Sequence, residues 1–352
     1  MSRRVDYMIV GQGLAGSALA WELMQRGKSL MVFDLPASNR ASSVAAGLYN
    51  PITGRVLTKT WMAEKVFPFL ESFYKDAERA TGEQFLHHVP IYRPFVSAEE
   101  RGQWVEKLHT DKIDGIDVIV HQAASFNIPN AYGGIEIVQS GYLNVTRWIE
   151  AVRNALIEKG SYSEQAFEDE LIEANQGVSY KDIMADKIIF CDGLRALRSR
   201  YFRWLPLRPL KGETLDVRLS FKPERLFNRG VYLAPTDNAE IFKVGATYEH
   251  APFSESTTAT GREYLASALN QLIARPFEVV HQDWGTRPTT PDRRPMLGSH
   301  PDNKNVVVFN GLGTKGVSLS PYFAHHLATW LEGNGDLSTE VNIYRFKALY
   351  SS

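Results

Sequence analysis

Apolar positions at the start of the chain predict a strand, a helix and a second strand in close succession. An unbroken apolar run over residues 5–10 predicts a buried strand. Residues 17–26 carry apolar positions at helical spacing, and Gly27, directly after them, is typical of a helix end. A second apolar strand follows over residues 30–34. Because the connections are short, we expect a βαβ unit in which the two strands are parallel neighbours.

The same pattern analysis predicts alternating elements along the rest of the chain. Helical spacing predicts helices over residues 61–81, 99–108, 144–159, 261–274 and 320–331. Shorter apolar runs predict strands over residues 85–92, 118–121, 135–138, 187–190, 214–219, 230–235, 241–246 and 306–309. Parallel α/β pieces therefore occur at the start, middle and end of the chain, with mostly antiparallel pieces between them. This order predicts two domains, each discontinuous in sequence.

The first strand is followed by a glycine-rich turn with the spacing GxGxxG, residues 11–16. In such a turn Gly11 allows the tight bend, Gly13 lets the backbone approach a pyrophosphate, and Gly16 lets the helix pack on the strand. Asp34 ends the second strand, where an acid usually binds a ribose hydroxyl and would repel a 2′-phosphate. The sequence therefore predicts a dinucleotide site, and this turn alone leaves FAD and NAD both open.

Composition narrows the class of protein further. The 352 residues include 39 Lys and Arg against 40 Asp and Glu, a balance that argues against wholesale binding to nucleic acid. The single cysteine, Cys191, excludes a disulfide framework and a site built from several cysteines. His87–His88 and His325–His326 are adjacent pairs whose rings diverge, so we expect no metal site. No apolar run reaches the length of a membrane span, and we expect a cytoplasmic protein.

Further motifs give the chain a family resemblance. The segments 41–51, 141–144, 185–193, 208–213, 232–235, 244–247, 287–298 and 310–317 occur in the order found in one family of flavoproteins. On these segments the chain resembles the D-amino acid oxidase/glycine oxidase family, and the resemblance covers nearly its whole length. The segments 287–298 and 310–317 are the most specific of them.

The resemblance implies FAD as the cofactor. It also implies a fold of the α/β class, which is α+β when the whole chain is considered. It implies a Rossmann-like FAD-binding domain of residues 1–84, 140–210 and 285–352, and a mostly antiparallel substrate domain of residues 85–139 and 211–284. The implied cofactor-binding residues are Gly11, Gly13, Leu14, Ala15, Gly16, Asp34, Ser42, Ser43, Ala46, Gly47, Gly193, Gly311, Gly313, Thr314, Lys315, Gly316 and Val317. Backbone N–H groups of residues 313–317, at a helix N-terminus, would face the flavin N1/C2=O edge. No His or Cys falls in residues 41–48, so we expect non-covalent FAD.

The resemblance also implies a substrate site. Arg287 matches the arginine that holds the substrate carboxylate in the family, although a structural salt bridge is the alternative. Tyr232 matches a tyrosine that often touches substrate, with a core aromatic residue as an equal alternative. Tyr248 and Tyr49 are weaker candidates, and Lys315 is either close to the flavin or solvated. The chain departs from the family pattern at Asp192 and Thr236, and Arg55 and Lys59 are candidates for a further anion site.

These observations predict an FAD-dependent oxidoreductase that oxidises a small amine or amino acid by hydride transfer to flavin N5. Three alternatives stay open. An oxidase domain of the tRNA wobble-uridine modification type would need a basic face, and usually a fused methyltransferase domain that we do not expect in this chain. A 2-hydroxy acid dehydrogenase and a flavin-binding protein without turnover are the others. The sequence leaves the substrate, the electron acceptor and the oligomeric state undetermined.

Overall fold

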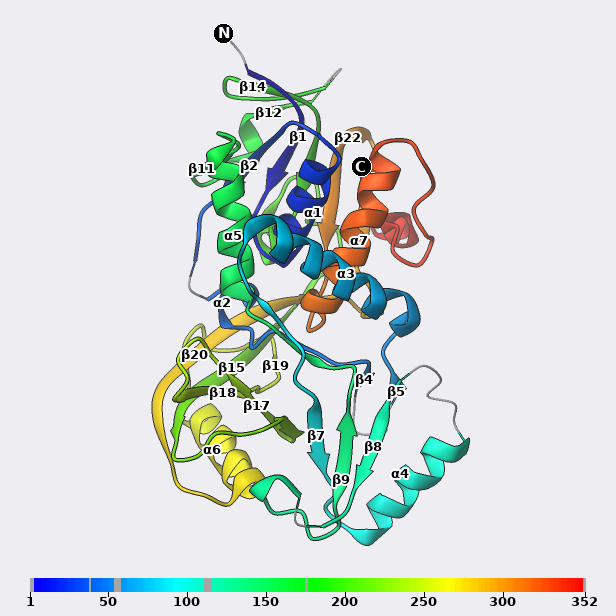
Figure 1. The fold of residues 1–352 in the computed structure, drawn as a ribbon. Helices are drawn as coiled ribbons and strands as arrows, with labels where there is room; N and C mark the ends of the chain where they lie inside the picture. Colours follow the sequence, from blue (N-terminus) through cyan, green and yellow to red (C-terminus); the bar gives the residue numbers. More distant parts are fainter. Residues whose placement is uncertain are drawn as a thin grey trace.

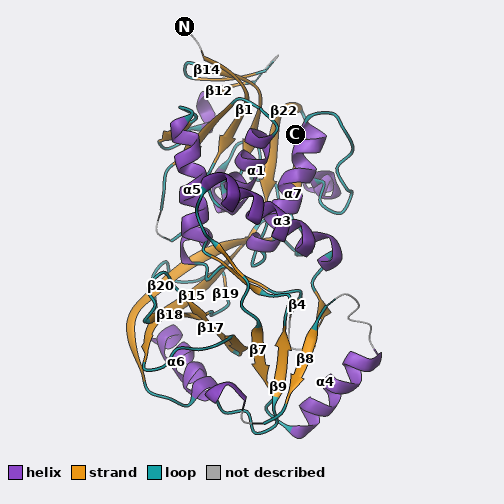
Figure 2. Cartoon of the chain, in the orientation of Figure 1, coloured by secondary structure: helices purple, strands orange, loops and turns teal. Residues whose placement is uncertain are grey.

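The computed structural model describes residues 3–37, 39–53, 58–110, 116–123, 125–174 and 177–350. Figure 1 shows two bodies stacked along the long axis of the molecule, with the N-terminus at one end. The upper body in that view is a sheet covered by helices. The lower body consists mostly of strands, with fewer helices at its outside (Figure 2).

The upper body is built on a sheet whose central strands are parallel. Strand β1 pairs in parallel with β2 and β14, and β14 pairs in parallel with β22. Strand β11 adds a parallel edge, whereas β12, β13 and β21 are antiparallel to their neighbours. The bounds are β1 (Arg3–Val10), β2 (Leu30–Asp34), β11 (Tyr162–Glu164), β12 (Ile172–Glu173), β13 (Val178–Tyr180), β14 (Ile183–Phe190), β21 (Met296–His300) and β22 (Asn303–Asn310).

Both faces of this sheet are covered, which explains why β2 is buried at every position and β1 is buried from Tyr7 to Val10. Ile9 packs with the helices on one face, whereas Met8 and Val10 pack into a second cluster on the other. The first cluster joins side chains from α1 (Leu14–Gln25), α3 (Ala63–Thr81), α5 (Val145–Glu158) and α7 (Gly316–Leu331). The second is closed by residues from and around η2 (Asp169–Leu171), η3 (Gly193–Arg198) and η4 (Ile343–Leu349).

The lower body is a mostly antiparallel sheet in the order β19-β15-β18-β17-β16-β7-β9-β8, with β20 paired to the other edge of β15. One face carries α6 (Ala259–Ile273), which packs on Leu215 and Val244. The bounds are β7 (Ile91–Pro94), β8 (Val118–His121), β9 (Gly134–Ile137), β15 (Arg208–Leu219), β16 (Leu226–Arg229), β17 (Val231–Pro235), β18 (Ile241–Gly245), β19 (Glu249–His250) and β20 (Phe277–Thr289).

Small elements complete the chain. Strands β3 (Leu48–Tyr49), β6 (Leu86–His87) and β10 (Gly141–Leu143) form a three-stranded sheet, and β4 (Ile52–Thr53) pairs with β5 (Thr58–Lys59). The single-turn helix α2 (Ala41–Val44) contacts β20. Helix α4 (Ala98–Thr110) packs near β8 and β9, and η1 (Ser125–Asn127) follows β8.

The predicted fold class is confirmed, with two differences in detail. The long strand β20 was not predicted, and Figure 1 shows it as a yellow ribbon that curves from the lower body toward the upper one. The predicted boundaries cut through β15 and β20. Ile52, assigned to the FAD-binding domain, packs instead with Phe95 and Trp104 of the lower body.

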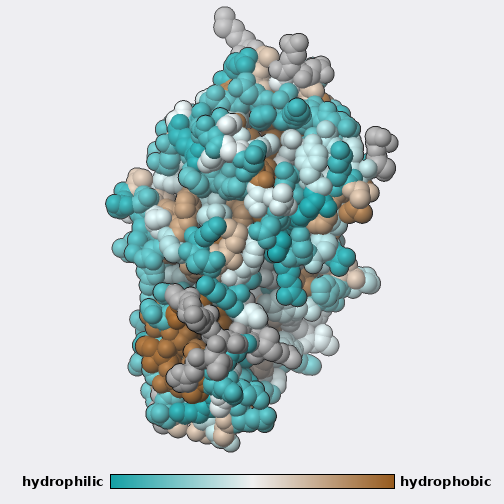
Figure 3. Space-filling model, turned by 90° about the vertical axis from the view of Figure 1, so that its right-hand side faces the viewer, coloured by the Kyte–Doolittle hydropathy of each residue, from teal (hydrophilic) through white to brown (hydrophobic). Residues whose placement is uncertain are grey.

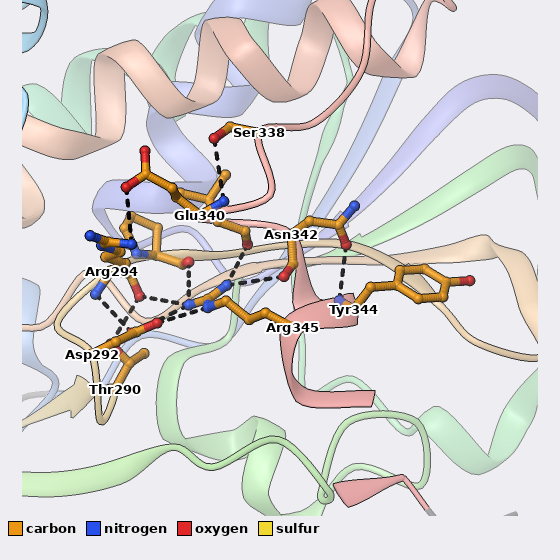
Figure 4. A network of polar contacts seen from close by, with 10 residues as sticks. Thr290, Asp292, Arg294, Ser338, Glu340, Asn342, Tyr344 and Arg345 are labelled. Carbon is orange, nitrogen blue, oxygen red and sulfur yellow. Dashed lines mark hydrogen bonds and ion pairs between the residues drawn. The ribbon is translucent and has the colours of Figure 1, made fainter. Parts of the chain in front are cut away.

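Hydrogen bonds and ion pairs connect the C-terminal segment around η4 to the loop between β20 and β21 (Figure 4). Arg345 Nε donates to a carboxylate oxygen of Asp292 at 2.8 Å, and its other nitrogens donate to the carbonyls of Pro295 and Val341. Burial alone would raise the pKa of Asp292, but the hydrogen bonds from Arg345 and from the N–H of Arg294 hold it below its usual value. Asp292 therefore organises the loop that follows the predicted substrate arginine.

The face of the molecule in Figure 3 is mainly hydrophilic, with one apolar patch on the lower body beside atoms that are not described. Among the described residues, no helix combines the length and the apolar character needed to cross a bilayer.

Candidate active site

The glycine-rich turn forms a cradle at the N-terminus of α1. Gly11 adopts a φ of +93°, which only glycine tolerates readily. A Cβ at Gly16 would overlap the carbonyl oxygen of Gly11, so the helix can approach β1 this closely only without a side chain. Above Gly13 the space is open except for Ser42 Oγ, 3.0 Å from the position of a Cβ. The turn therefore leaves room for a group that lies against the backbone.

Helix α2 places one of its two serines at this cradle. Ser42 Oγ accepts a hydrogen bond from the N–H of Leu14 at 3.2 Å, which leaves its hydroxyl hydrogen free to reach an anion. Ser43 is exposed, and its hydroxyl donates to the carbonyl of Ala37. The structure brings Ser42 to the N-terminus of α1, whereas the side chain of Ser43 is turned elsewhere.

Asp34 lies at the end of β2, beside the same turn, and its side chain is almost fully buried. Its Oδ1 accepts the N–H of Gln12 at 2.9 Å, and both carboxylate oxygens receive Arg40 nitrogens at 3.1 Å. A carboxylate has about four lone-pair positions, so one stays available for a ribose hydroxyl. The sequence analysis did not identify Arg40 as part of this site. Because Arg40 is positively charged, the carboxylate at the ribose end of the site is paired and not free.

The N-terminus of α7 lies against that of α1, because a Cβ at Gly316 would contact Leu14 Cδ1. Not all the backbone groups predicted here are free. The N–H of Gly313 donates to the carbonyl of Pro288 and that of Lys315 to the carbonyl of Leu312, each at 3.0 Å. Within the described part of the chain, the N–H groups of Thr314, Gly316 and Val317 make no hydrogen bond. Of the five backbone N–H groups predicted to face the flavin, only those of these three residues are therefore available to donate a hydrogen bond.

Lys315 lies half-buried at the start of α7. Burial lowers the pKa of its ammonium group, and the nearby positive charge of Arg293 lowers it further. A desolvated cation beside a second cation gains most from an anionic neighbour. The end of the site next to α7 is therefore electropositive, which suits the carbonyl edge of a flavin.

The other predicted cofactor residues have distinct places. Gly193 and Gly311 take positive φ values of 60° and 74°, and Asn310 Nδ2 donates to the Gly193 carbonyl at 2.8 Å. Gly47 packs against the backbone of Leu143, so its role in the structure is close strand contact. Ala46 belongs to the apolar cluster that contains Tyr232. Ala15 is the second residue of α1 and is buried.

Behind the turn lie Cys191 and Asp192. Both side chains are unsuited to reaction with a cofactor: the thiol is buried, and burial raises its pKa well above the usual value. Burial also raises the pKa of Asp192 to about 7, and its Oδ1 has no partner among the described residues. This carboxyl group, which the family pattern replaces by a small residue, is therefore partly protonated near neutral pH.

Taken together, these groups fit FAD. The open backbone at Gly13, the Ser42 hydroxyl and the start of α1 would hold a pyrophosphate, and Asp34 a ribose. The start of α7 would hold the flavin edge.

The lower body turns a row of glycines toward this site. Gly212 of β15 pairs with Gly285 of β20, and Thr214 of β15 pairs with Gly245 of β18. A Cβ at Gly285 would contact Val44 of α2, so this face of the sheet looks toward the upper body. Glycines weaken strand interiors unless something must approach the backbone closely. Here the approaching groups are side chains of the sheet itself.

Arg287 lies over the first of these glycines, since a Cβ at Gly212 would overlap its guanidinium group. The Tyr248 ring lies 5.1 Å from the Arg287 Cζ atom in a cation–π contact. Nη1 of Arg287 is buried, and it makes no hydrogen bond to any described residue. A buried cationic donor without a partner is expensive unless an anion binds there.

Tyr232 lies over Gly245, because the Tyr232 hydroxyl would overlap a Cβ at that residue. Burial raises the pKa of the phenol, and the positive charge of Arg287 acts in the opposite direction. Tyr232 packs on the apolar cluster of Ile91, Leu226 and Ala234, as do Ala46 and Leu48. The structure thus brings Arg287, Tyr232 and Tyr248 together at the junction of the two bodies.

The fourth predicted catalytic residue, Tyr49, has no place in this cluster. Its hydroxyl lies 3.0 Å from His88 Nδ1, and its ring packs in the core of the upper body near Phe67. Successive residues of a strand face opposite sides, so Leu48 faces away from this core and packs on the cluster that Tyr232 also contacts. The structure thus places Tyr49 apart from Arg287, Tyr232 and Tyr248.

The predicted extra anion site is only partly within the described structure. Arg55 lies outside the described residues, and Lys59 forms an ion pair with Glu64 at 3.2 Å. No group of three or more His, Cys, Asp or Glu side chains capable of holding a metal occurs in the described ranges.

Comparisons with known proteins agree with this geometry. The family model described as FAD dependent oxidoreductase, DAO, matches residues 6–330. Glycine oxidase of Bacillus licheniformis is 22% identical over 95% of each chain. The bifunctional protein ThiO/ThiG of Trichormus variabilis is 26% identical over 93% of this chain, which spans only about half (52%) of that relative.

The fold is also similar to solved structures. The crystal structure of glycine oxidase from Geobacillus kaustophilus superposes with a TM-score of 0.80 over 98% of both chains, at 21% identity. This likeness concerns the fold, whereas the family match extends over most of the sequence. The chain therefore belongs to the FAD dependent oxidoreductase (DAO) family, and FAD is its cofactor.

Proposed function

We propose that this flavoenzyme oxidises the C–N bond of a small amine or amino acid whose carboxylate binds Arg287, with FAD held non-covalently. The observation that carries the proposal is the environment of Arg287. Its guanidinium lies between the backbone at Gly212 and the ring of Tyr248, with Nη1 buried and without a partner among the described residues. The alternative, a structural salt bridge, would need an acidic partner, and no ion pair of Arg287 occurs within the described part.

A carboxylate suits this place better than a single hydrogen-bond acceptor. The planar guanidinium can donate two parallel hydrogen bonds to two carboxylate oxygens, which fixes both position and orientation. The adjacent Tyr232 hydroxyl makes no hydrogen bond to a described residue, so it can donate to the same group. An amino acid held in this way presents its Cα in one orientation.

When bound, FAD supplies the acceptor for the two electrons that leave the substrate. The protein's own part is to bind, orient and desolvate. Arg287 and Tyr232 hold the carboxylate, and Tyr248 covers the guanidinium on its outer side. Ala46 and Leu48 pack on the same apolar cluster as Tyr232, and this apolar surface lowers the amount of water near the reacting carbon.

Anaerobic mixing of the yellow holoenzyme with a panel of compounds tests this proposal. The panel contains small primary and secondary amines, both enantiomers of the simple amino acids, and 2-hydroxy acids. Loss of the flavin absorbance with amines or amino acids supports the proposal. Bleaching by 2-hydroxy acids alone would assign the enzyme to hydroxy acid oxidation. No bleaching by any compound would favour a flavin-binding protein without turnover, or a larger substrate such as a modified tRNA uridine.

A further inference from the structure

The face of the lower sheet that carries Arg287 continues away from the FAD-binding body as a row of polar side chains. Along β15, Gly212, Thr214 and Asp216 share this face, because alternate residues of a strand point the same way. Lys243 of β18 is the cross-strand neighbour of Asp216. Each step of two residues along the strand is about 7 Å, so this row begins at the guanidinium and leads outward.

The row contains hydrogen-bonding capacity that the protein does not use. Thr214 is 2% exposed, and its Oγ1 has no hydrogen-bond partner among the described residues. Its Cγ2 lies beside Gly245 and the Tyr232 ring, in the middle of the proposed site. An orphaned buried hydroxyl costs stability, so a ligand group that bonds to it would recover that cost.

Asp216 and Lys243 close the row as an ion pair. Lys243 Nζ lies 2.8 Å from Asp216 Oδ1, and the two side chains are 14% and 22% exposed for Lys243 and Asp216 respectively. Leu215 and Val217, on the opposite face of the same strand, are buried against α6. The polar face of β15 is therefore the one that points away from α6.

We propose that Thr214 and the Asp216–Lys243 pair determine substrate choice, and that the preferred substrate is an amino acid whose side chain ends in a carboxamide. This inference rests on the proposed function, which places the substrate carboxylate at Arg287. From there a side chain of about five non-hydrogen atoms spans the step to Thr214 and reaches toward the ion pair.

The chemistry of the pair selects a neutral end that both donates and accepts. A carboxamide NH₂ can donate to Asp216 while its carbonyl accepts from Lys243 or Thr214. A carboxylate or ammonium end would face one partner of like charge, and an aliphatic end would leave Thr214 without a bond and place apolar atoms against the ion pair. Sites built to hydrogen-bond a substrate reject an analogue without the polar group more strongly than apolar pockets reject an extra atom.

The first test compares two amino acids of the same shape. Glutamine and homoleucine differ only in the polar atoms at the end, and both enantiomers of each are assayed. The wild-type enzyme should favour glutamine by roughly 10- to 100-fold in kcat/KM, the range expected from hydrogen bonds to charged groups. Thr214→Val should lower this ratio several-fold, and the double variant Asp216→Leu/Lys243→Met should reverse it.

A matched control lies one row further along the same strand. Arg218 forms an exposed ion pair with Glu278, and Arg218→Met should leave the preference unchanged. All variants are checked for FAD content and thermal unfolding, so that misfolding is recognised. An unchanged preference in both Thr214→Val and the double variant would overturn the inference while leaving the proposed function intact.

A binding experiment separates the two proposals. The acids 4-carbamoylbutanoate and 5-methylhexanoate are the same two compounds without the amine, so they can bind but cannot be oxidised at a C–N bond. Titration followed by the flavin spectrum should show tighter binding of the carbamoyl acid, by a factor that Thr214→Val reduces. The carbamoyl acid could bind more tightly although no amine bleaches the flavin. In that case the proposed reaction is wrong, but the proposed preference for a carboxamide ligand is supported. Equal or absent binding of both acids overturns the inference.

Discussion

Arg287 is the side chain on which the proposed chemistry depends most directly. Truncating one partner of a buried charged pair costs about 2–5 kcal/mol, so Arg287→Ala should lower kcat/KM for the best amine by roughly 30- to several-thousand-fold. Arg287→Lys keeps the charge but loses the planar fork, and it should lose a large part of the same activity. Steady-state kinetics of both variants measure this.

The flavin-to-protein ratio provides the control for that prediction. The Arg287 side chain lies on the lower sheet over Gly212 and is not among the groups expected to hold FAD, so FAD content should be nearly unchanged. A variant with full activity would remove Arg287 from the site. Parallel loss of FAD and of the folded state would instead indicate a structural role.

Gly13 gives a second residue-scale prediction, because open space beside its backbone is what a pyrophosphate requires. Gly13→Leu should reduce FAD retention by roughly tenfold or more, since the side chain fills that space. Gly102 in α4 is a matched control: nothing lies within 4 Å of a Cβ there, and Gly102→Leu should bind FAD normally. Equilibrium titration of each apoprotein with FAD makes the comparison, and equal affinities would contradict the assignment of this turn.

At the scale of elements, the loop between β20 and β21 holds its shape through one carboxylate. Asp292→Asn removes the charge that receives Arg345, and this should destabilise the protein by about 1–3 kcal/mol at pH 7. The folded-state pKa of Asp292 is lowered, so its contribution is present above the unfolded pKa of about 3.9 and is lost as pH falls through the folded value. The difference between wild type and variant should therefore shrink below about pH 4.

Urea unfolding at neutral and acidic pH measures that difference. Asp76 forms a fully surface ion pair with Arg79, and Asp76→Asn should change stability little at either pH. A pH-independent penalty for Asp292→Asn would show that the carboxylate charge is not what the loop uses.

The elements also show how far sequence reasoning reaches. The first βαβ unit follows from apolar runs and a glycine turn. The helix predicted over residues 144–159 is also present as α5, which Asn144 caps by accepting the N–H of Arg147. β20 was missed because its residues are only half-buried, so they show neither a continuous apolar run nor a clean alternation. α7 begins at Gly316 instead of residue 320, because its buried Ser318, Ser320 and Pro321 hide the helical period.

The site was predicted unevenly for physical reasons of the same kind. Glycines and charged residues of local motifs could be read directly, including the turn at residues 11–16 and Arg287. Contacts between distant strands could not: Gly212 and Gly245 gain meaning only from the sheet register that places side chains over them. The sequence could not show that the Tyr49 ring packs into the core of the upper body, because a two-residue strand is too short for a period that would reveal which side faces inward.

At the scale of the whole molecule, the FAD site draws on segments that are far apart in sequence. The cradle combines α1, α2 and α7, and α7 begins about 300 residues after α1. Global unfolding must therefore destroy the site, so FAD binds the folded state only. The cofactor should stabilise the chain by mass action, by about 2.7 kcal/mol at a free concentration 100 times its dissociation constant.

Thermal unfolding of the apoprotein at increasing FAD concentrations tests this coupling, with the midpoint expected to rise continuously. NAD at the same concentrations should produce no comparable shift, because FAD is the family's cofactor and we expect the start of α7 to hold its flavin edge. Precipitation with acid should release intact FAD into the supernatant, since Cys191 is buried behind the turn and its thiol is held in the neutral form. Flavin that stays attached to the denatured chain would disprove non-covalent binding, and an equal midpoint shift with NAD would show that the site does not select the flavin.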